Sequence, residues 1–485
     1  MGWQPSNEQS SFIERYAAAL GAGDAALFAG AGLSRSSGYV DWRALLRDVA
    51  HDLGLDIDRE SDLIAVAQYH LNEKRNRGRL NRTIIDELDR AAITPTRAHS
   101  LLARLPIPVV WTTNYDRLLE QAHEAVGKIV DVKLTQDNLA QAKRGRDVVI
   151  YKMHGCVTQP QEAVITRDDY ENYERKRPLF VESLKGDLIQ KTFLFLGFSF
   201  TDPNIDYILS RLRVLLGTNV REHFCIMRAP QAPGRLSGRR RAELEYERRK
   251  TQLRHSDLLR FGIETVWVDD YSDTGPLLEA LSAFAHRKSV LISGAARDPT
   301  PLGASRLNTL THNIASRLIR DGYTLVTGFG VGLGEQCVLA ALHALHGIPK
   351  GHELERLVVR PFPAVEKAHQ LSQNTRHRED LVARSGSVIV ISGNRECSSG
   401  TEISPGVLEE VEIALREGKP VIPVGVSGHA ARQVWDRAVA DPGRYLPGLS
   451  AKRSLDTLGD PKATNDQLIG AVFDLLTKAQ MAAKP

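Results

Sequence analysis

Two polar side chains with catalytic potential each follow a short apolar run that predicts a buried strand. Asn114 follows Val109–Thr112, and His154 closely follows the run that begins at Val148. A third run ends at Ala29 and leads into a Gly-Ala-Gly turn. An imidazole can act as a general base, an amide carbonyl can orient water, and glycines let a backbone approach a phosphate. Ligands of parallel sheets bind beyond the carboxyl ends of the strands, so these residues predict a nucleotide site that carries out a reaction.

The elements that must position these residues follow an alternating strand and helix pattern along the whole chain. This alternation predicts an α/β fold with two doubly wound, Rossmann-like parallel sheets. Helical patterns include Trp42–Leu53 and Asp202–Leu216, and Ala232–Arg254 is interpreted as a loop and a solvated surface helix. The stretch Ala285–Lys288 is interpreted as a junction, so we expect domains at residues 1–284 and 288–478. The predicted strands are Ala25–Ala29, Val109–Thr112, Val148–Met153, Thr192–Leu196, Phe224–Met227, Thr265–Val268, Ser289–Ile292, Tyr323–Val326, Leu357–Val359, Ser387–Ile391 and Val421–Val424.

Composition narrows the class of protein. The chain has 485 residues, which is too long for one hydrophobic core, with 42% hydrophobic and 25% charged residues. A net charge of +4 argues against a dedicated nucleic-acid or membrane binder. The four cysteines form no Cys-x-x-Cys pair, so neither a disulfide framework nor a metal site is expected. With a polar start and no long apolar stretch, the chain is expected to be cytoplasmic.

The order of motifs in the first half resembles the sirtuin family over roughly Ala17–Phe284. Gly-Ala-Gly comes first, then Thr-Thr-Asn-Tyr-Asp, His-Gly and Gly-Phe-Ser, each after a predicted strand. The resemblance implies that Asn114 and His154 are catalytic. Alone, they would be interpreted as an Asx-turn and a satisfied buried histidine, and the glycines as a tight turn. The residues implied to bind NAD are Gly30, Ala31, Gly32, Ser34, Asp116, Gly197 and Ser199.

One departure from the sirtuin pattern changes the expected reaction. Sirtuin deacylases carry a zinc module with two Cys-x-x-Cys pairs after the histidine, whereas this sequence has a charged and aromatic segment at 159–186. That module helps to build the acyl-lysine groove, so we expect water as the second substrate and no metal. NAD is then a substrate of a glycohydrolase. A protein deacylase or ADP-ribosyltransferase is the alternative, and a non-catalytic NAD sensor or scaffold is a third hypothesis.

The second half has its own nucleotide signals. Glycine-rich turns follow two predicted strands, and Pro405-Gly406-Val407-Leu408-Glu409-Glu410 resembles the nucleotide-binding signature of the SLOG superfamily with altered glycines. Arginine recognises phosphate through its bidentate fork, and a glutamate can accept from ribose hydroxyls. The alternatives are that the arginines are surface charges and that Glu410 stabilises a helix N-terminus. The residues predicted to bind an effector are Ser293, Gly294, Gly328, Gly330, Gly332, Arg378, Arg395 and Glu410.

The combination of the two halves resembles the ThsA effector family of the bacterial Thoeris anti-phage system. The resemblance implies that the SLOG-like domain binds a cyclic ADP-ribose isomer made by a TIR-domain partner protein. Binding would activate NAD hydrolysis in the sirtuin-like domain and deplete NAD in the infected cell. It also implies a homotetramer or a higher assembly.

Overall fold

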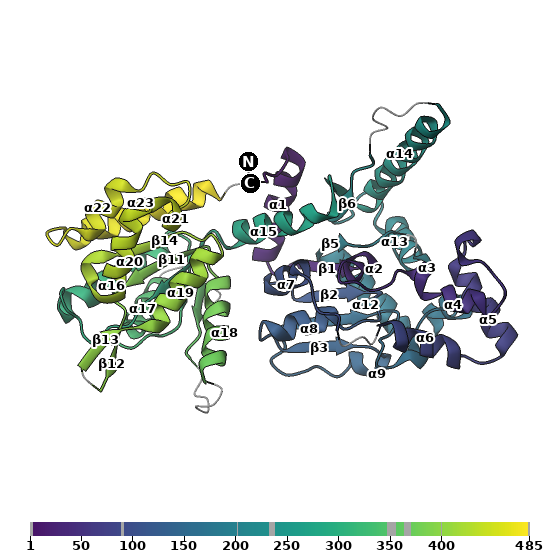
Figure 1. Cartoon of the computed structure of the whole chain (residues 1–485), viewed down its shortest axis with the longest axis horizontal. Helices are drawn as coiled ribbons and strands as arrows, with labels where there is room; N and C mark the ends of the chain where they lie inside the picture. Colours follow the sequence, from purple (N-terminus) through teal and green to yellow (C-terminus); the bar gives the residue numbers. More distant parts are fainter. Residues whose placement is uncertain are drawn as a thin grey trace. The chain divides into compact units, whose positions relative to one another are not determined.

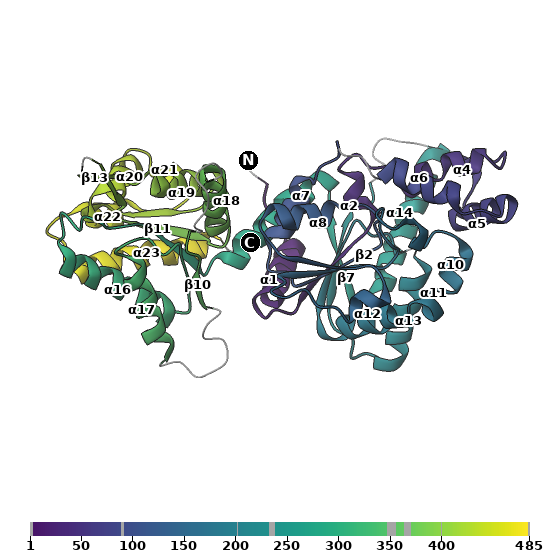
Figure 2. The same cartoon turned by 90° about the horizontal axis from the view of Figure 1, so that it is seen from below.

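The computed structural model describes residues 3–88, 92–200, 202–231, 238–346, 356–362, 370–398 and 400–483. The chain divides into two compact units, Met1–Ser282 and Ala283–Pro485, each with its own parallel sheet (Figures 1 and 2). Helix α15 (Thr274–His286) runs across the division. Among the described residues, no helix is both long and apolar enough to cross a membrane.

Unit 1 is built on a seven-stranded sheet with the order β3-β4-β2-β1-β5-β6-β7, in which all neighbouring strands are parallel. The chain adds β2 on one side of the central β1 and later returns to add β5 on the other side. This reversal is the switch point at which doubly wound sheets bind ligands. The strands are β1 (Ala25–Ala29), β2 (Val109–Thr112), β3 (Val130–Lys133), β4 (Val148–Lys152), β5 (Thr192–Leu196), β6 (His223–Arg228) and β7 (Ile263–Val268).

Helices bury the sheet of unit 1 on both faces, so every residue of β1 and β5 is buried. On one face, α1 contacts β1, β5 and β7. Helices α12 and α13 pack their apolar residues against Phe28 of β1 and Phe195 of β5. The helices of this unit are α1 (Asn7–Gly21), α2 (Ala31–Arg35), α3 (Trp42–Leu45), α4 (Arg47–His51), α5 (Leu63–Lys74), α6 (Gly78–Leu88), α7 (Arg97–Arg104), α8 (Leu118–Ala125), α9 (Gln136–Leu139), α10 (Arg167–Glu171), α11 (Tyr173–Lys176), α12 (Pro178–Gln190), α13 (Pro203–Leu216) and α14 (Gly238–Leu258).

Two features of unit 1 differ from the sequence prediction. The single helix expected over Trp42–Leu53 is divided at Leu46 into α3 and α4, because Leu46 leaves the helical conformation. Strand β3 was not predicted, since its charged residues Asp131 and Lys133 interrupt the apolar run. The predicted surface helix is present as α14, in which only Leu258 is buried; the loop residues 232–237 lie outside the described residues.

Unit 2 contains a five-stranded parallel sheet with the order β10-β9-β8-β11-β14 and a separate antiparallel hairpin, β12-β13. The strands are β8 (Ser289–Ser293), β9 (Thr324–Thr327), β10 (Leu357–Val359), β11 (Ser387–Ile391), β12 (Asn394–Cys397), β13 (Gly400–Ile403) and β14 (Val421–Val424). The helices are α16 (Ala304–Arg320), α17 (Gly334–His346), α18 (Gln370–Ala383), α19 (Pro405–Arg416), α20 (His429–Ala440), α21 (Pro442–Tyr445), α22 (Lys452–Gly459) and α23 (Asn465–Ala482). One hydrophobic core runs through this unit.

Candidate functional site

The sheet of unit 1 brings the predicted site residues to one edge, the one formed by the carboxyl ends of its strands. The neighbouring strands β4, β2, β1 and β5 are in register at their carboxyl ends, where Lys152, Thr112, Ala29 and Leu196 form a row. The Gly-Ala-Gly turn and Gly197 follow Ala29 and Leu196 directly, and Asn114 and His154 lie two residues after Thr112 and Lys152. Residues more than 160 positions apart in the sequence therefore lie along one edge of the sheet.

Asn114 is buried and its side-chain amide is held in one orientation. Its Nδ2 donates hydrogen bonds to the carbonyl of Gly30 at 3.0 Å and to Ser34 Oγ at 2.8 Å. Because a backbone carbonyl can only accept, the nitrogen must be on that side and Oδ1 must be on the other. Both N–H groups are thereby used. The amide carbonyl remains as the polar atom able to orient a substrate or a water molecule.

Ser34 links Asn114 to Asp116. Its hydroxyl accepts from Asn114 and donates to Asp116 Oδ2 at 2.6 Å, and all three side chains are buried. The other carboxylate oxygen of Asp116 accepts from the backbone of Leu118 at 3.0 Å. Beneath them, Lys152 donates to the carbonyl of Asp116 and forms a fully buried ion pair with Glu120 at 3.0 Å. The predicted residues Ser34, Asn114 and Asp116 are thus one connected hydrogen-bonded chain.

His154 is 3% exposed and lies under two tyrosines. Its ring packs edge-to-face on Tyr170 and Tyr173, at centroid separations of 5.4 and 6.3 Å. Its Nε2 lies 3.3 Å from Asp202 Oδ2. Burial lowers the pKa of His154 below its usual value, against the opposing effect of Asp202. The imidazole is therefore neutral at neutral pH, as a general base requires.

The two glycine turns of unit 1 pack backbone to backbone. A Cβ on Gly30 would lie 2.4 Å from the carbonyl oxygen of Gly197, and a Cβ on Gly197 would lie 2.3 Å from the nitrogen of Leu33. The N–H groups of Gly30 and Gly32 already donate to the carbonyls of Leu196 and Gly197. Close approach of the β1 and β5 turns explains these glycines, whereas Ala31 and Ser199 are exposed at the same edge.

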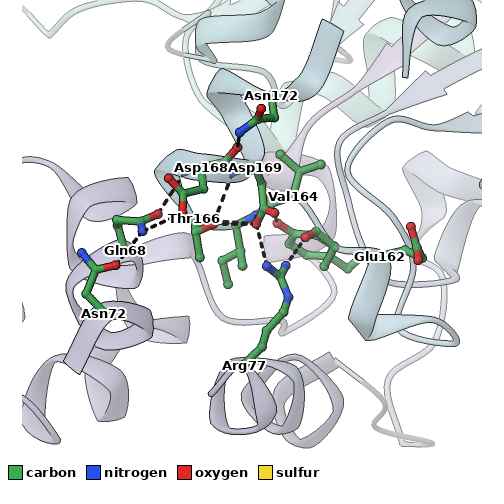
Figure 3. Close-up of polar contacts among 12 residues, drawn as sticks. Gln68, Asn72, Arg77, Glu162, Val164, Thr166, Asp168, Asp169 and Asn172 are labelled. Carbon is green, nitrogen blue, oxygen red and sulfur yellow. Dashed lines mark hydrogen bonds and ion pairs between the residues drawn. The ribbon is translucent and has the colours of Figure 1, made fainter. Parts of the chain in front are cut away.

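The segment after His154, where sirtuin deacylases carry zinc cysteines, is held by polar contacts to α5 and to Arg77 (Figure 3). Asp169 accepts from Arg77 at 2.8 Å and from the backbone and hydroxyl of Thr166. These donors hold the pKa of Asp169 below its usual value although burial raises it. Gln68 exchanges two hydrogen bonds with Asp168, each of 3.0 Å. These contacts of Asp168 and Asp169 fix α10. They thereby fix Tyr170, whose ring packs against His154.

Several residues around His154 were not predicted as site residues. Asp202 is the first residue of a predicted helical stretch, but nothing in the sequence indicates that it faces an imidazole 48 positions earlier. Tyr170, Tyr173 and Arg177 were seen as members of a charged and aromatic segment; Arg177 donates to the carbonyl of Met153 at 3.0 Å. Within the described ranges, no group of three or more His, Cys, Asp or Glu side chains is arranged to hold a metal ion.

The sheet of unit 2 also places glycine turns at adjacent strand ends. A Cβ on Gly330 would lie 2.0 Å from the carbonyl oxygen of Gly294, and one on Gly294 would lie 2.1 Å from that of Ile391. Gly332 packs in the same way against Ala296, and Gly328 against Leu381 and Phe362. The turns after β9, β8 and β11 therefore form one surface.

A buried carboxyl and an arginine lie beside these turns. Ser293, the last residue of β8, donates to Glu410 Oε2 at 2.5 Å, and burial raises the pKa of Glu410 to about 7. Arg378 forms an ion pair of 2.8 Å with Glu409, and its guanidinium carbon lies 5.0 Å from the ring centre of Phe362. Its Nε is buried and, within the described residues, makes no hydrogen bond. Sequence reasoning did not select Glu409 or Phe362.

Arg395 is placed differently from the other predicted effector residues. It lies on the β12-β13 hairpin, opposite Glu402 in the register, and the two side chains form an ion pair of 2.6 Å. Both side chains are about half exposed, at 58% and 44%. The structure brings Ser293, Gly294, Gly328, Gly330, Gly332 and Glu410 together with Arg378 nearby, and it does not show Arg395 in contact with them.

Comparison of this sequence with known proteins supports its division into two units. An NAD(+) hydrolase ThsA of Bacillus cereus is 39% identical over 469 residues, covering 96% of this chain and 97% of that protein. A second NAD(+) hydrolase ThsA, from Acinetobacter baumannii, is 36% identical and covers 97% and 99%. The chain belongs to the ThsA family. Two family models match parts of this ThsA family member. A SIR2-like domain matches residues 108–255, and a Sir2- and TIR-associating SLOG family matches residues 273–479.

This ThsA family member has a further, more distant relative over part of its length. Defense-associated sirtuin 2 of Bacillus subtilis is 26% identical over 215 residues, which is 43% of this chain and 21% of that protein. The fold is thus a SIR2-like unit followed by a SLOG unit, as the sequence predicted.

Proposed function

We propose that this member of the ThsA family hydrolyses NAD⁺ to nicotinamide and ADP-ribose at the strand ends of unit 1. The observation that carries the proposal is the fixed amide of Asn114 and the neutral, buried His154 after the ends of two neighbouring strands, in a chain similar over nearly its full length to proteins named NAD(+) hydrolase. One relative is named defense-associated sirtuin 2, and we infer that depletion of NAD⁺ is a defensive outcome.

In the proposed reaction, the bond between the nicotinamide nitrogen and ribose C1′ breaks, and nicotinamide leaves as a neutral base. Positive charge develops at C1′, and the carbonyl oxygen of Asn114 orients the attacking water. The oxygen of that water forms the new bond to C1′. His154 takes up the proton that the water or a ribose hydroxyl loses, and it returns the proton to solvent. The products are nicotinamide, ADP-ribose and one proton.

The NAD⁺ contacts in this proposal come from the same edge of the sheet. Gly30, Ala31, Gly32, Gly197 and Ser199 form the turns against which the dinucleotide would lie. Ser34 and Asp116 hold Asn114 in place, as their hydrogen bonds support. The proposed NADase domain spans residues 1–284.

We infer that unit 2, at residues 288–478, is the sensor of the system. The proposed activator is a cyclic ADP-ribose isomer made by a TIR-domain partner protein. Arg378 would meet its phosphates and Glu410 its ribose hydroxyls, beside Ser293 and the glycine turns; Arg395 would have to leave Glu402 to take part. The active form is proposed to be a cytoplasmic homotetramer or a higher assembly.

The test is nicotinamide release from NAD⁺ by the purified full chain, with and without a panel of cyclic ADP-ribose isomers. We expect release in the presence of one isomer and none from the His154→Ala or Asn114→Ala variants. A folded wild-type protein that binds NAD⁺ without cleaving it under any isomer would contradict the proposal, as would deacylation of an acyl-lysine peptide without net NAD⁺ hydrolysis.

A further inference from the structure

Asp202 lies close to His154 but is not one of the two proposed catalytic side chains. It is the N-cap of α13, where its Oδ1 accepts from the backbone N–H groups of Asn204 at 3.0 Å and Ile205 at 3.2 Å. Its other oxygen, Oδ2, lies 3.3 Å from Nε2 of His154. One carboxylate therefore has two separate neighbours, a helix end on one side and an imidazole on the other.

The remaining charged and titratable groups near His154 are engaged elsewhere. Asp169 is committed to Arg77 and Thr166, and Arg177 to the carbonyls of Leu134, Met153 and Glu162. The hydroxyl of Tyr173 donates to the carbonyl of Met153, and Tyr170 contacts His154 through its ring. Nε2 of His154 is buried and, in the described part of the chain, makes no hydrogen bond; its ion-pair neighbour is the carboxylate of Asp202, whose Oδ2 lies 3.3 Å away.

From this geometry we propose that Asp202 is a positioning residue that fixes the tautomer of His154. A carboxylate can only accept, so the ring proton of the neutral imidazole is on Nε2, and Nδ1 is the nitrogen with the free lone pair. Nδ1 is then the atom that takes the proton during the reaction. This inference rests on the proposed NADase function for its catalytic consequence, but the tautomer itself does not depend on that function.

The cap of α13 makes a sharp substitution available. In Asp202→Asn, the amide oxygen must stay on the side of Asn204 and Ile205, because two donors would otherwise face each other. The amide nitrogen then faces Nε2 and donates to it, which drives the ring proton to Nδ1. Asparagine is as good an N-cap as aspartate, so this variant keeps the helix end intact.

In Asp202→Ala, by contrast, the cap is lost but no donor opposes the productive tautomer. We expect the alanine variant to unfold at a lower temperature than the asparagine variant and yet to be the more active of the two. A residue with a purely structural role would give the opposite order of activity. A matched control is Asp441→Asn, which changes another aspartate N-cap, at α21 in unit 2, where Asp441 accepts from the backbone of Arg444 at 3.2 Å.

The experiment measures nicotinamide release by the full-length variants under activating conditions, with kcat and KM separated. We expect kcat of Asp202→Asn to fall at least 100-fold with KM within threefold of wild type; the equivalent carboxylate-to-amide change in a serine protease lowers kcat by about 10⁴. Asp202→Ala should lose about tenfold, and Asp441→Asn should match wild type. Because the negative charge on Asp202 raises the pKa of His154, the acid limb of the rate profile should move to lower pH in Asp202→Ala. Equal or higher activity of Asp202→Asn relative to Asp202→Ala would overturn the inference.

A second measurement keeps the inference separate from the proposed function. Solid-state NMR of the full chain with ¹⁵N-labelled histidine, assigned by comparison with His154→Gln, reports which ring nitrogen carries the proton. We expect Nε2–H in wild type and Nδ1–H in Asp202→Asn. A wild-type Nδ1–H signal would overturn the inference even if NAD⁺ were cleaved. If the wild type released no nicotinamide, the proposed function would fail while this spectrum still decided the tautomer.

Discussion

Replacing Ser34 with alanine tests whether the hydrogen-bonded chain from Asn114 through Ser34 to Asp116 holds the amide in place. The change removes one buried hydroxyl and leaves an N–H of Asn114 and Oδ2 of Asp116 without that partner. The space left by a hydroxyl is smaller than a water molecule, so solvent cannot take over both bonds. An unsatisfied buried donor costs about 1–3 kcal/mol, and a lost bond to a carboxylate about 1.5–3 kcal/mol.

We therefore expect Ser34→Ala to lower the unfolding free energy of unit 1 by about 2.5–6 kcal/mol. Nicotinamide release should fall by about 10- to 100-fold, because a freed amide no longer points its carbonyl in one direction. Urea unfolding followed by hydrogen exchange of the β2 peptides measures the first effect, and product chromatography measures the second.

The matched control for this prediction is Ser36→Ala. Ser36 is exposed, and its hydroxyl donates to the carbonyl of Leu33 at 2.6 Å. Its loss should cost less than about 0.5 kcal/mol and leave activity unchanged. The reasoning would be refuted if Ser34→Ala unfolded at the same urea concentration as Ser36→Ala and kept wild-type activity.

Four further outcomes follow from the same contacts. Because burial lowers the pKa of His154, the midpoint of the acid-side decline in nicotinamide release should lie below pH 6.5, and a midpoint above 7 would contradict this. Burial also lowers the pKa of His99 to about 4, so the unfolded state takes up a proton first, and His99 alone should account for about 2 kcal/mol of the stability that unit 1 loses between pH 6.5 and 5, measured by urea unfolding of wild type and His99→Gln. Glu410 has the opposite sign: its raised pKa of about 7 means that unit 2 should lose about 3 kcal/mol as pH rises from 4.5 through 7, which hydrogen exchange of the β8 peptides can measure. Arg378→Ala should abolish the response to an activating cyclic nucleotide without changing NAD⁺ affinity, whereas Arg384→Ala, which removes a pair between the residue after α18 and Asp380, should leave both intact in titration calorimetry.

The sequence predicted the elements whose physical signal is local. Strands such as β1 and β5 are buried on both faces and appear as uninterrupted apolar runs, so their positions were predicted correctly. Strand β3 lies at the edge of the sheet, where Asp131 and Lys133 form an ion pair of 3.0 Å, and its mixed sequence carries no such signal.

The candidate site was predictable only where it follows a strand end. Asn114 and His154 stand out because each comes directly after an apolar run. The contact between His154 and Asp202 depends on how α13 begins after β5, and this is a tertiary arrangement with no local pattern. The pairing of Arg395 with Glu402 likewise requires the β12-β13 hairpin, which the sequence analysis did not predict.

The most direct test of the central claim is a side-by-side assay of NAD⁺ cleavage by the wild type and by His154→Ala and Asn114→Ala variants that fold normally. We expect the wild type, given one cyclic ADP-ribose isomer, to release nicotinamide and ADP-ribose in equal amounts, and both variants to release neither. Full activity in either folded variant would contradict the assignment of the reaction to this edge of the sheet.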